Sequence, residues 1–307
     1  MKKINKIAIL VRLKGKDTSL LEHCRKLALI NASTEIYIIY VTTKKDSNEL
    51  LNIEENDQYH NRIAEYESRL RTYADDFFGD IPKLNTNILV KFGKVASNLL
   101  KIVDAANIDL LVLSKVWSAK KTDKLSMKLA RLSPSKLLML PKHLPEQTEK
   151  YMVSIDQSVT DMSALKEAIN MASKQNNNPV VICQNLCSMP AVDGLSDVDF
   201  EKFKAVIAQS ARRYFEKLMA RIDVGNIKVE AEYTFCIDED PVDIIYHKAL
   251  EHKPDVVVIG SCELSSTSAW LMSATSEKFL QLNNTFAMQI ARERGHYASL
   301  VEIIKKE

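Results

Sequence analysis

The stretch DVVVIGSCELSSTSAWLMSATSEKFLQLNNTFAMQIAR, residues Asp255–Arg292, decides the fold of this chain. It opens with an unbroken β-branched run, Val256–Ile259, which stops at Gly260. A hydroxyl-rich loop, a helix pattern over 270–280 and a last apolar run over 286–290 follow. Such runs are typical of strands buried on both faces of a parallel sheet. Where a strand is followed by a polar loop and a helix start, open α/β sheets bind ligands, phosphates in particular.

The same plan occurs earlier in the chain, over residues 109–140. Asp109 and Asp255 both precede an apolar run and lie 146 positions apart (255 − 109). The first apolar runs of the two copies start at Lys6 and Lys150, 144 positions apart (150 − 6). Two landmarks at nearly one offset indicate a duplicated domain, because the repeats of a solenoid have periods of roughly 20–50 residues.

Strands and helices alternate through both copies, which predicts two tandem doubly wound, Rossmann-like α/β domains. Each is expected to have a five-stranded parallel sheet flanked by helices, and the two to pack as a pseudo-dimer. We expect the first domain at 1–143, the second at 144–292 and a tail at 293–307, with a loop at 187–197. The predicted strands are 7–11, 36–41, 86–92, 110–113, 137–140, 151–155, 180–184, 228–235, 256–259 and 286–290.

Composition excludes several classes of protein. The 307 residues carry a net charge of +2 and no basic stripe, which argues against nucleic acid as a partner. No run approaches the roughly 20 apolar residues of a membrane span. Five scattered cysteines are typical of a reducing compartment, so we expect a cytoplasmic protein. The chain shows neither a Walker lysine motif nor G-x-G-x-x-G after the first strand of either copy.

Three segments of the second copy resemble the universal stress protein family in its tandem two-domain form. They are Val153–Ser158, the segment from Asp240 to Ser261, and Thr275–Phe279. The resemblance covers nearly the whole chain. It implies an adenine nucleotide α-hydrolase-like fold, a stress-response role without catalysis, and a ligand groove in the second domain.

Members of that family that bind ATP carry Gly-x2-Gly-x9-Gly-Ser/Thr, in which glycines admit phosphates to the backbone N–H groups. The second copy keeps Gly260 but has Glu263 at the second glycine position and Ser273-Ala274 at the closing pair. Asp156 matches the family's acidic residue near adenosine. The nucleoside end is thus partly retained and the phosphate end altered. The resemblance implies a ligand groove formed by Asp156, Gly260, Ser261, Ser265, Ser273 and Ser276, although helix capping and loop hydrogen bonds also explain the serines.

The first copy departs further from the pattern. Arg12 stands at the position of the acidic residue, Ser114 at the first glycine and Trp117 at the next. We therefore expect no ATP in the first domain.

Two functional hypotheses remain. The first is a non-enzymatic stress-response protein that binds a partner protein or a small ligand. This protein would act as a single chain, with its two domains as a pseudo-dimer, or as a homodimer of chains. The alternative is an ATP or AMP sensor that acts through the second domain with at most slow hydrolysis. No catalytic residues and no metal ligands are expected. An ATP-pyrophosphatase is disfavoured because the segment 156–161 lacks the glycines of that phosphate loop.

Overall fold

The computed structural model describes residues 3–13, 17–42, 57–115, 124–141, 148–189, 197–237, 239–263, 270–282 and 285–292. These residues form two compact units, one within 3–141 together with Trp270 and the other within 148–263 and 271–292. Within the described ranges, every helix is too short or too polar to cross a membrane.

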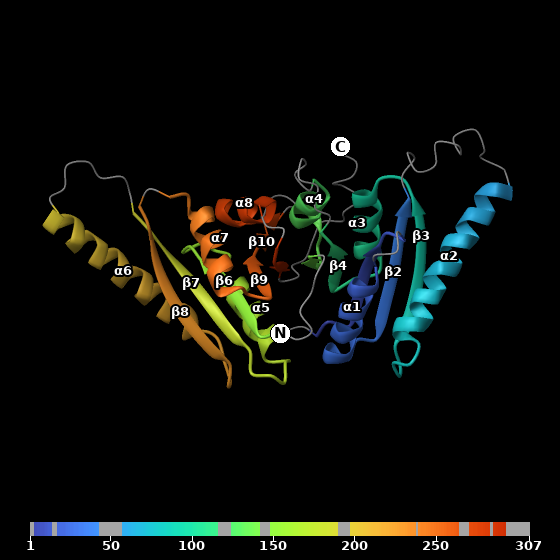
Figure 1. Ribbon diagram of the computed structural model, residues 1–307, viewed down its shortest axis with the longest axis horizontal. Coiled ribbons are helices and arrows are strands. Elements are labelled where there is room, and N and C mark those ends of the chain that lie inside the picture. Colours follow the sequence, from blue (N-terminus) through green and yellow to red (C-terminus); the bar gives the residue numbers. More distant parts are fainter. Residues whose placement is uncertain are drawn as a thin grey trace. The chain divides into compact units, whose positions relative to one another are not determined.

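The first unit contains a parallel sheet of five strands in the order β3-β2-β1-β4-β5, with its helices beside it (Figure 1). The strands are β1 (Lys6–Val11), β2 (Glu35–Thr42), β3 (Asn85–Phe92), β4 (Leu110–Ser114) and β5 (Lys136–Leu140). The helices are α1 (Thr18–Asn31), α2 (Asp57–Phe78), α3 (Val95–Ala105) and α4 (Lys124–Leu132).

The second unit repeats this topology, with the strand order β12-β9-β6-β7-β8. Its strands are β6 (Lys150–Ile155), β7 (Val180–Ser188), β8 (Lys228–Cys236), β9 (Val256–Gly260) and β12 (Ala287–Ala291). The helices are α5 (Asp161–Ala172), α6 (Asp197–Met219), α7 (Pro241–His252) and α8 (Ala274–Leu282), and two short strands, β10 (Cys262–Glu263) and β11 (Trp270–Leu271), follow β9. The predicted five-stranded parallel sheets are confirmed.

The core of each unit is its central strands, as the unbroken apolar runs predict. All residues of β9 are buried, and β4 is buried except at its last residue. From the central strand, β1 or β6, the chain proceeds through the next two strands to one edge of the sheet. It then returns to the other side of the central strand, at β4 or β9. Right-handed crossovers therefore place the helices of the outward and return paths on opposite faces. The reversal lies between β1 and β4 in the first unit and between β6 and β9 in the second, which is where ligands bind in open α/β sheets.

An aspartate binds the start of the central strand in both units. The Asp109 Oδ2 accepts hydrogen bonds from the backbone N–H groups of Asn5 (3.0 Å) and Lys6 (3.1 Å). Asp255 Oδ2 accepts the equivalent bonds from the N–H groups of residues 149 (2.7 Å) and 150 (2.9 Å). Both pairs of donors lie 144 positions apart (149 − 5 and 150 − 6), so the duplication extends to individual hydrogen bonds.

The turn after the central strand is also repeated. Leu13 (φ 56°) and Gln157 (φ 62°) both adopt left-handed backbone conformations and lie 144 positions apart (157 − 13). In each unit an aspartate at the start of the next helix binds the backbone of this turn. Asp17 accepts from the N–H groups of Arg12 and Leu13, and Asp161 accepts from the N–H group of Ser158. The acidic side chain therefore holds the turn closed.

The sequence prediction was wrong at two places, and a third prediction is not tested. Residues 270 and 271 lie in β11, and the helix that was expected to include them begins at Ala274. Strand β7 continues to Ser188 and α6 begins at Asp197, so both ends of the expected 187–197 loop belong to regular elements. The tail at 293–307 lies outside the described residues.

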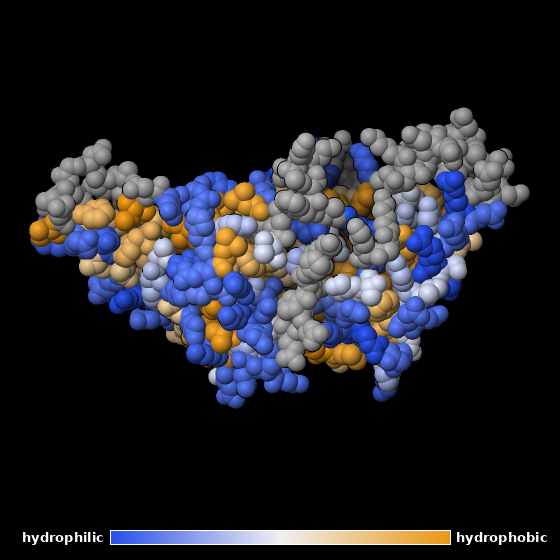
Figure 2. Space-filling view, in the orientation of Figure 1, coloured by the Kyte–Doolittle hydropathy of each residue, from blue (hydrophilic) through white to orange (hydrophobic). Residues whose placement is uncertain are grey.

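Helix α6 covers β7 and β8 only loosely at its N-terminal half. Phe200, Phe203 and Ile207 are half-buried, whereas Val198 and Val206 are 65% and 62% exposed. Figure 2 shows the resulting hydrophobic surface along α6, interrupted by hydrophilic residues. The apolar stripe of this helix is thus buried mainly toward its C-terminal end.

Candidate functional site

A cavity opens at the carboxyl edge of the second unit's sheet, where β6 and β9 end. It encloses about 340 Å³ of empty space, which includes space open to solvent. The lining residues are Ser154, Asp156, Thr160, Asp161, Ala164, Ile245, Val257, Val258, Ile259, Gly260, Ser276 and Phe279.

Two carboxyl groups face each other on one side of this cavity. Asp156 follows β6 and is half-buried, whereas Asp161 begins α5 and is only 2% exposed. The two side chains interact with each other. Burial raises the pKa of Asp161 to about 7, and the negative charge of Asp156 contributes to the rise. The cavity therefore contains a carboxyl group that titrates near neutral pH.

A set of hydroxyl groups fixes Asp161 in place. The Ser158 hydroxyl donates to Asp161 Oδ1 (2.9 Å), and the Ser158 N–H donates to Oδ2 (3.2 Å). Tyr214 of α6 donates to the backbone oxygen of Ser158 (3.1 Å) and is also hydrogen-bonded to Asp161. Burial, together with the charge of Asp161, raises the pKa of the Tyr214 hydroxyl. The phenol therefore stays protonated and can act as a donor.

Gly260 lies against the backbone of the turn that precedes α5. A Cβ atom at this position would come within 1.9 Å of the Thr160 carbonyl oxygen and 2.8 Å of the Ser163 Oγ. Side-chain carbons do not approach backbone oxygens so closely, so β9 and α5 can pack here only when residue 260 is glycine. Close packing of the protein on itself thus accounts for this glycine without any ligand.

The predicted serines do not all reach the cavity. Ser276 lines it, whereas Ser273 caps α8 by accepting a hydrogen bond from the Ser276 N–H (3.2 Å). Ser261 is buried and donates to the Ala291 backbone oxygen (2.7 Å), so its hydroxyl is directed toward β12. Ser265 lies outside the described residues. The cavity thus brings together Asp156, Gly260 and Ser276 of the six predicted site residues.

Sequence reasoning missed Asp161 as a member of the site. An acidic residue in the first turn of a helix is common because it complements the helix dipole, and that ordinary explanation conceals a second role. One signal was available, since a helix that follows a strand directly begins at the carboxyl edge where the strand ends. Asp161 lies five positions after Asp156 (161 − 156), within reach of the same edge.

In the first unit a basic side chain occupies the corresponding edge. Arg12, which corresponds to Asp156, extends across the ends of the strands and donates from Nη2 to the Ser114 backbone oxygen (3.2 Å). Ser114 corresponds to Gly260 at an offset of 146 (260 − 114). The end of β1 is therefore bound to the end of β4 by the protein's own guanidinium group.

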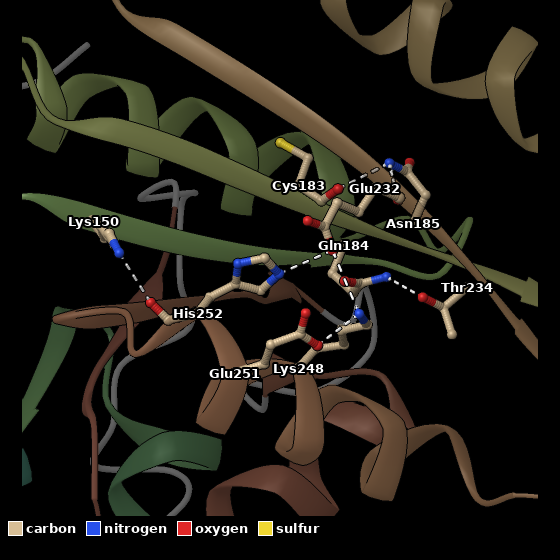
Figure 3. Close-up of polar contacts among 9 residues, drawn as sticks. All are labelled: Lys150, Cys183, Gln184, Asn185, Glu232, Thr234, Lys248, Glu251 and His252. Atoms are coloured by element: carbon tan, nitrogen blue, oxygen red, sulfur yellow. Dashed lines mark hydrogen bonds and ion pairs between the residues drawn. The ribbon is translucent and has the colours of Figure 1, made fainter.

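A second group of polar side chains joins α7 to the strands β7 and β8 (Figure 3). His252 Nε2 lies 2.9 Å from Glu232 Oε2, and Lys248 lies within 3.9 Å of the same carboxylate and 2.8 Å of Glu251. The contacts fix the end of α7 to β8, an edge strand of this unit. Among the described residues, no group of three or more His, Cys, Asp and Glu side chains could hold a metal ion.

Comparison with solved structures gives full-length similarities. A universal stress protein from Archaeoglobus fulgidus superimposes with a TM-score of 0.64 at 15% identity, covering 96% of this chain and 100% of that one. A functionally unknown protein from Pseudomonas aeruginosa superimposes with a TM-score of 0.68 at 14% identity, covering 99% and 98%. The chain therefore has the fold of a tandem universal stress protein, as its sequence motifs indicate.

Sequence comparison adds nothing to this likeness, because no family model and no curated protein match the chain.

Proposed function

We propose that this chain is a non-enzymatic cytosolic protein of the universal stress type, which acts by binding a nucleoside-like small ligand in the groove of its second unit. The observation that carries the proposal is the cavity at the strand-order reversal between β6 and β9, with Asp156 on its rim. An ionised carboxylate is a strong acceptor for a pair of ribose hydroxyl groups. Ile245 and Phe279 supply apolar wall against which a base can pack.

The charges of the groove support a nucleoside better than a nucleoside triphosphate. Among the described residues that line the cavity, none is Lys, Arg or His, and two are aspartates. Glu263 follows in the sequence at the position of a phosphate-binding glycine. Negative groups repel polyphosphate, and phosphoryl transfer needs positive groups to stabilise its transition state. We therefore propose binding without catalysis.

A nucleotide sensor is the second candidate, since Asp156 and Gly260 both line the cavity, as this hypothesis requires. In that case AMP or ATP is the ligand. The two candidates differ in the expected order of affinities. A nucleoside site binds adenosine at least as tightly as AMP and much more tightly than ATP, whereas a sensor gains affinity from the phosphates.

Calorimetric titration of the full-length protein with adenosine, AMP and ATP at pH 6.5 tests the proposal. We expect adenosine to bind, and Asp156→Ala to weaken it about 10- to 100-fold, because hydrogen bonds to a charged group contribute about 1.5–3 kcal/mol. Asp199→Ala, on the exposed side of α6, is the matched control and should bind as the wild type does. Tighter binding of ATP than of adenosine would favour the sensor, and absence of binding by all three at millimolar concentration would refute both candidates.

A further inference from the structure

Asp156 and Asp161 line the same cavity, and their carboxyl groups interact with each other. Ionised carboxylates have acceptor atoms only, so two of them cannot form a hydrogen bond with each other. Two like charges at contact distance in a partly buried site also repel strongly, and such pairs commonly retain one proton between them. The contact in this cavity is therefore that of a carboxylic acid with a carboxylate.

None of the described residues that line the cavity carries a positive charge that would stabilise a second ionised group. From α6, Tyr214 reaches Asp161 with a neutral hydroxyl. The cavity is faced by apolar residues and Gly260 from β9, by Ile245 from α7, and by Ser276 and Phe279 from α8. On α5 itself the next acidic residue, Glu167, lies six positions further along and accepts a hydrogen bond from Gln289 of β12. Burial raises the pKa of Asp161 to about 7, as expected for this environment.

We infer that Asp156 and Asp161 share a single proton across the rim of the groove, and that the groove binds its ligand in this protonated state. The inference deepens the proposed function and rests on it for the ligand. A ligand that covers the groove removes water from the two carboxyl groups. Loss of water penalises the doubly ionised pair far more than the singly ionised pair. Ligand binding and proton retention are therefore linked, and affinity decreases as the pair loses its proton.

The affinity of the full-length protein for adenosine, measured between pH 6 and pH 9, tests this linkage. Adenosine is the probe because it carries no phosphate, whose second ionisation near pH 6 would overlap the measured range. For the wild type we expect binding about three- to tenfold weaker at pH 8.5 than at pH 6.5, because one linked proton changes affinity at most tenfold per pH unit. A constant affinity over this range would overturn the inference.

Asp161→Asn separates the shared proton from other effects of pH. The amide of Asn donates to Asp156 as the protonated acid does, and its one oxygen keeps one of the two hydrogen bonds from Ser158. This variant should retain wild-type affinity at pH 6.5 and lose the pH dependence. Asp17→Asn is the matched control in the first unit, where Arg12 replaces the partner carboxylate, and it should show the wild-type dependence. The inference fails if Asp161→Asn keeps the wild-type slope.

A measurement without ligand tests the shared proton by itself. In protein labelled with ¹³C at aspartate carboxyl groups, the Asp161 resonance, assigned by its loss in Asp161→Asn, should titrate with a midpoint near 7. A midpoint near the ordinary value of 3.8 would overturn the inference whether or not adenosine binds. A neutral midpoint together with absence of adenosine binding would confirm the proton and refute the proposed ligand.

Discussion

At the scale of the residue, Asp161 and Gly260 each owe their role in the site to one close neighbour. Asp161 differs from an ordinary acidic residue because it is buried beside Asp156. Gly260 differs from an ordinary strand residue because the Thr160 carbonyl oxygen lies where its Cβ would be. Each of these two neighbours therefore gives rise to a prediction about stability.

Gly260→Ala should destabilise the protein by about 2 kcal/mol or more, because overpacking costs about 1–3 kcal/mol and backbone atoms cannot move aside as side chains do. Urea denaturation followed by circular dichroism measures the effect. Gly225→Asn is the control, since no atom lies within 4 Å of a Cβ there and Asn tolerates the left-handed conformation (φ 51°). If the two substitutions cost the same, close packing is not the reason for Gly260.

The stability of the folded protein should depend on pH through Asp161. The folded state keeps the Asp161 proton up to about pH 7, whereas the unfolded chain releases it near 3.8. This proton therefore stabilises the fold fully below pH 3.8, and the contribution is lost as the pH rises to 7. The wild type should lose stability relative to Asp161→Asn between pH 5 and pH 7.5, as measured by the urea midpoint. A constant difference between the two proteins over this interval would contradict the prediction.

At the scale of the element, equivalent strands of the two units are held by equivalent carboxylates. Asp109 and Asp255 each connect the residue before one strand to the first N–H groups of its neighbour, so they fix the register of the central strands. Regular pairing continues along the strands from these points, from Ile7 opposite Leu110 and from Tyr151 opposite Val256.

Removal of either carboxylate should therefore destabilise its own unit. Asp109→Ala and Asp255→Ala each leave two backbone N–H groups without their acceptor, at a cost of about 1–2 kcal/mol. The effect should be greater for Asp109, whose bonds are less exposed. Thermal unfolding measures both, with Asp76→Ala on the exposed side of α2 as control. Loss no larger than that of the control would show that the carboxylates are not needed for register.

The strands could be predicted from sequence because strands buried on both faces are unbroken apolar runs, and most helices because burial of one face imposes a period on the apolar residues. Irregular segments could not, and Trp270 was assigned to a helix because its apolar side chain continued the helical pattern of Phe279 and Leu280. The site was predictable only in part. Asp156 and Gly260 carry the resemblance, but the pairing of Asp156 with Asp161 depends on how α5 packs on β9. A serine pattern likewise cannot distinguish a capping hydroxyl, as in Ser273, from one that faces a cavity, as in Ser276.

At the scale of the whole molecule, the two units share one topology but carry different side chains at the carboxyl edges of their sheets. The second unit has a carboxylate pair beside a cavity, whereas the first has Arg12 bound to Ser114. The domain boundaries at 143 and 144 and the pairing of the two units as a pseudo-dimer remain predictions.

This divergence predicts one adenosine molecule per chain. Calorimetric stoichiometry measures it, and Arg12→Ala should change neither the stoichiometry nor the affinity, because Arg12 belongs to the other unit. Two molecules per wild-type chain would contradict the assignment of the site to the second unit.

The contact between Gly260 and Thr160 has a consequence for how such chains evolve. Selection for a foldable protein is sufficient to retain this glycine, because any side chain would separate β9 from α5. A lineage can therefore stop binding phosphate, replace the neighbouring glycines, and still carry the first glycine of the motif. A single surviving glycine in a descendant then records the architecture of its ancestor rather than the ligand of its own present function.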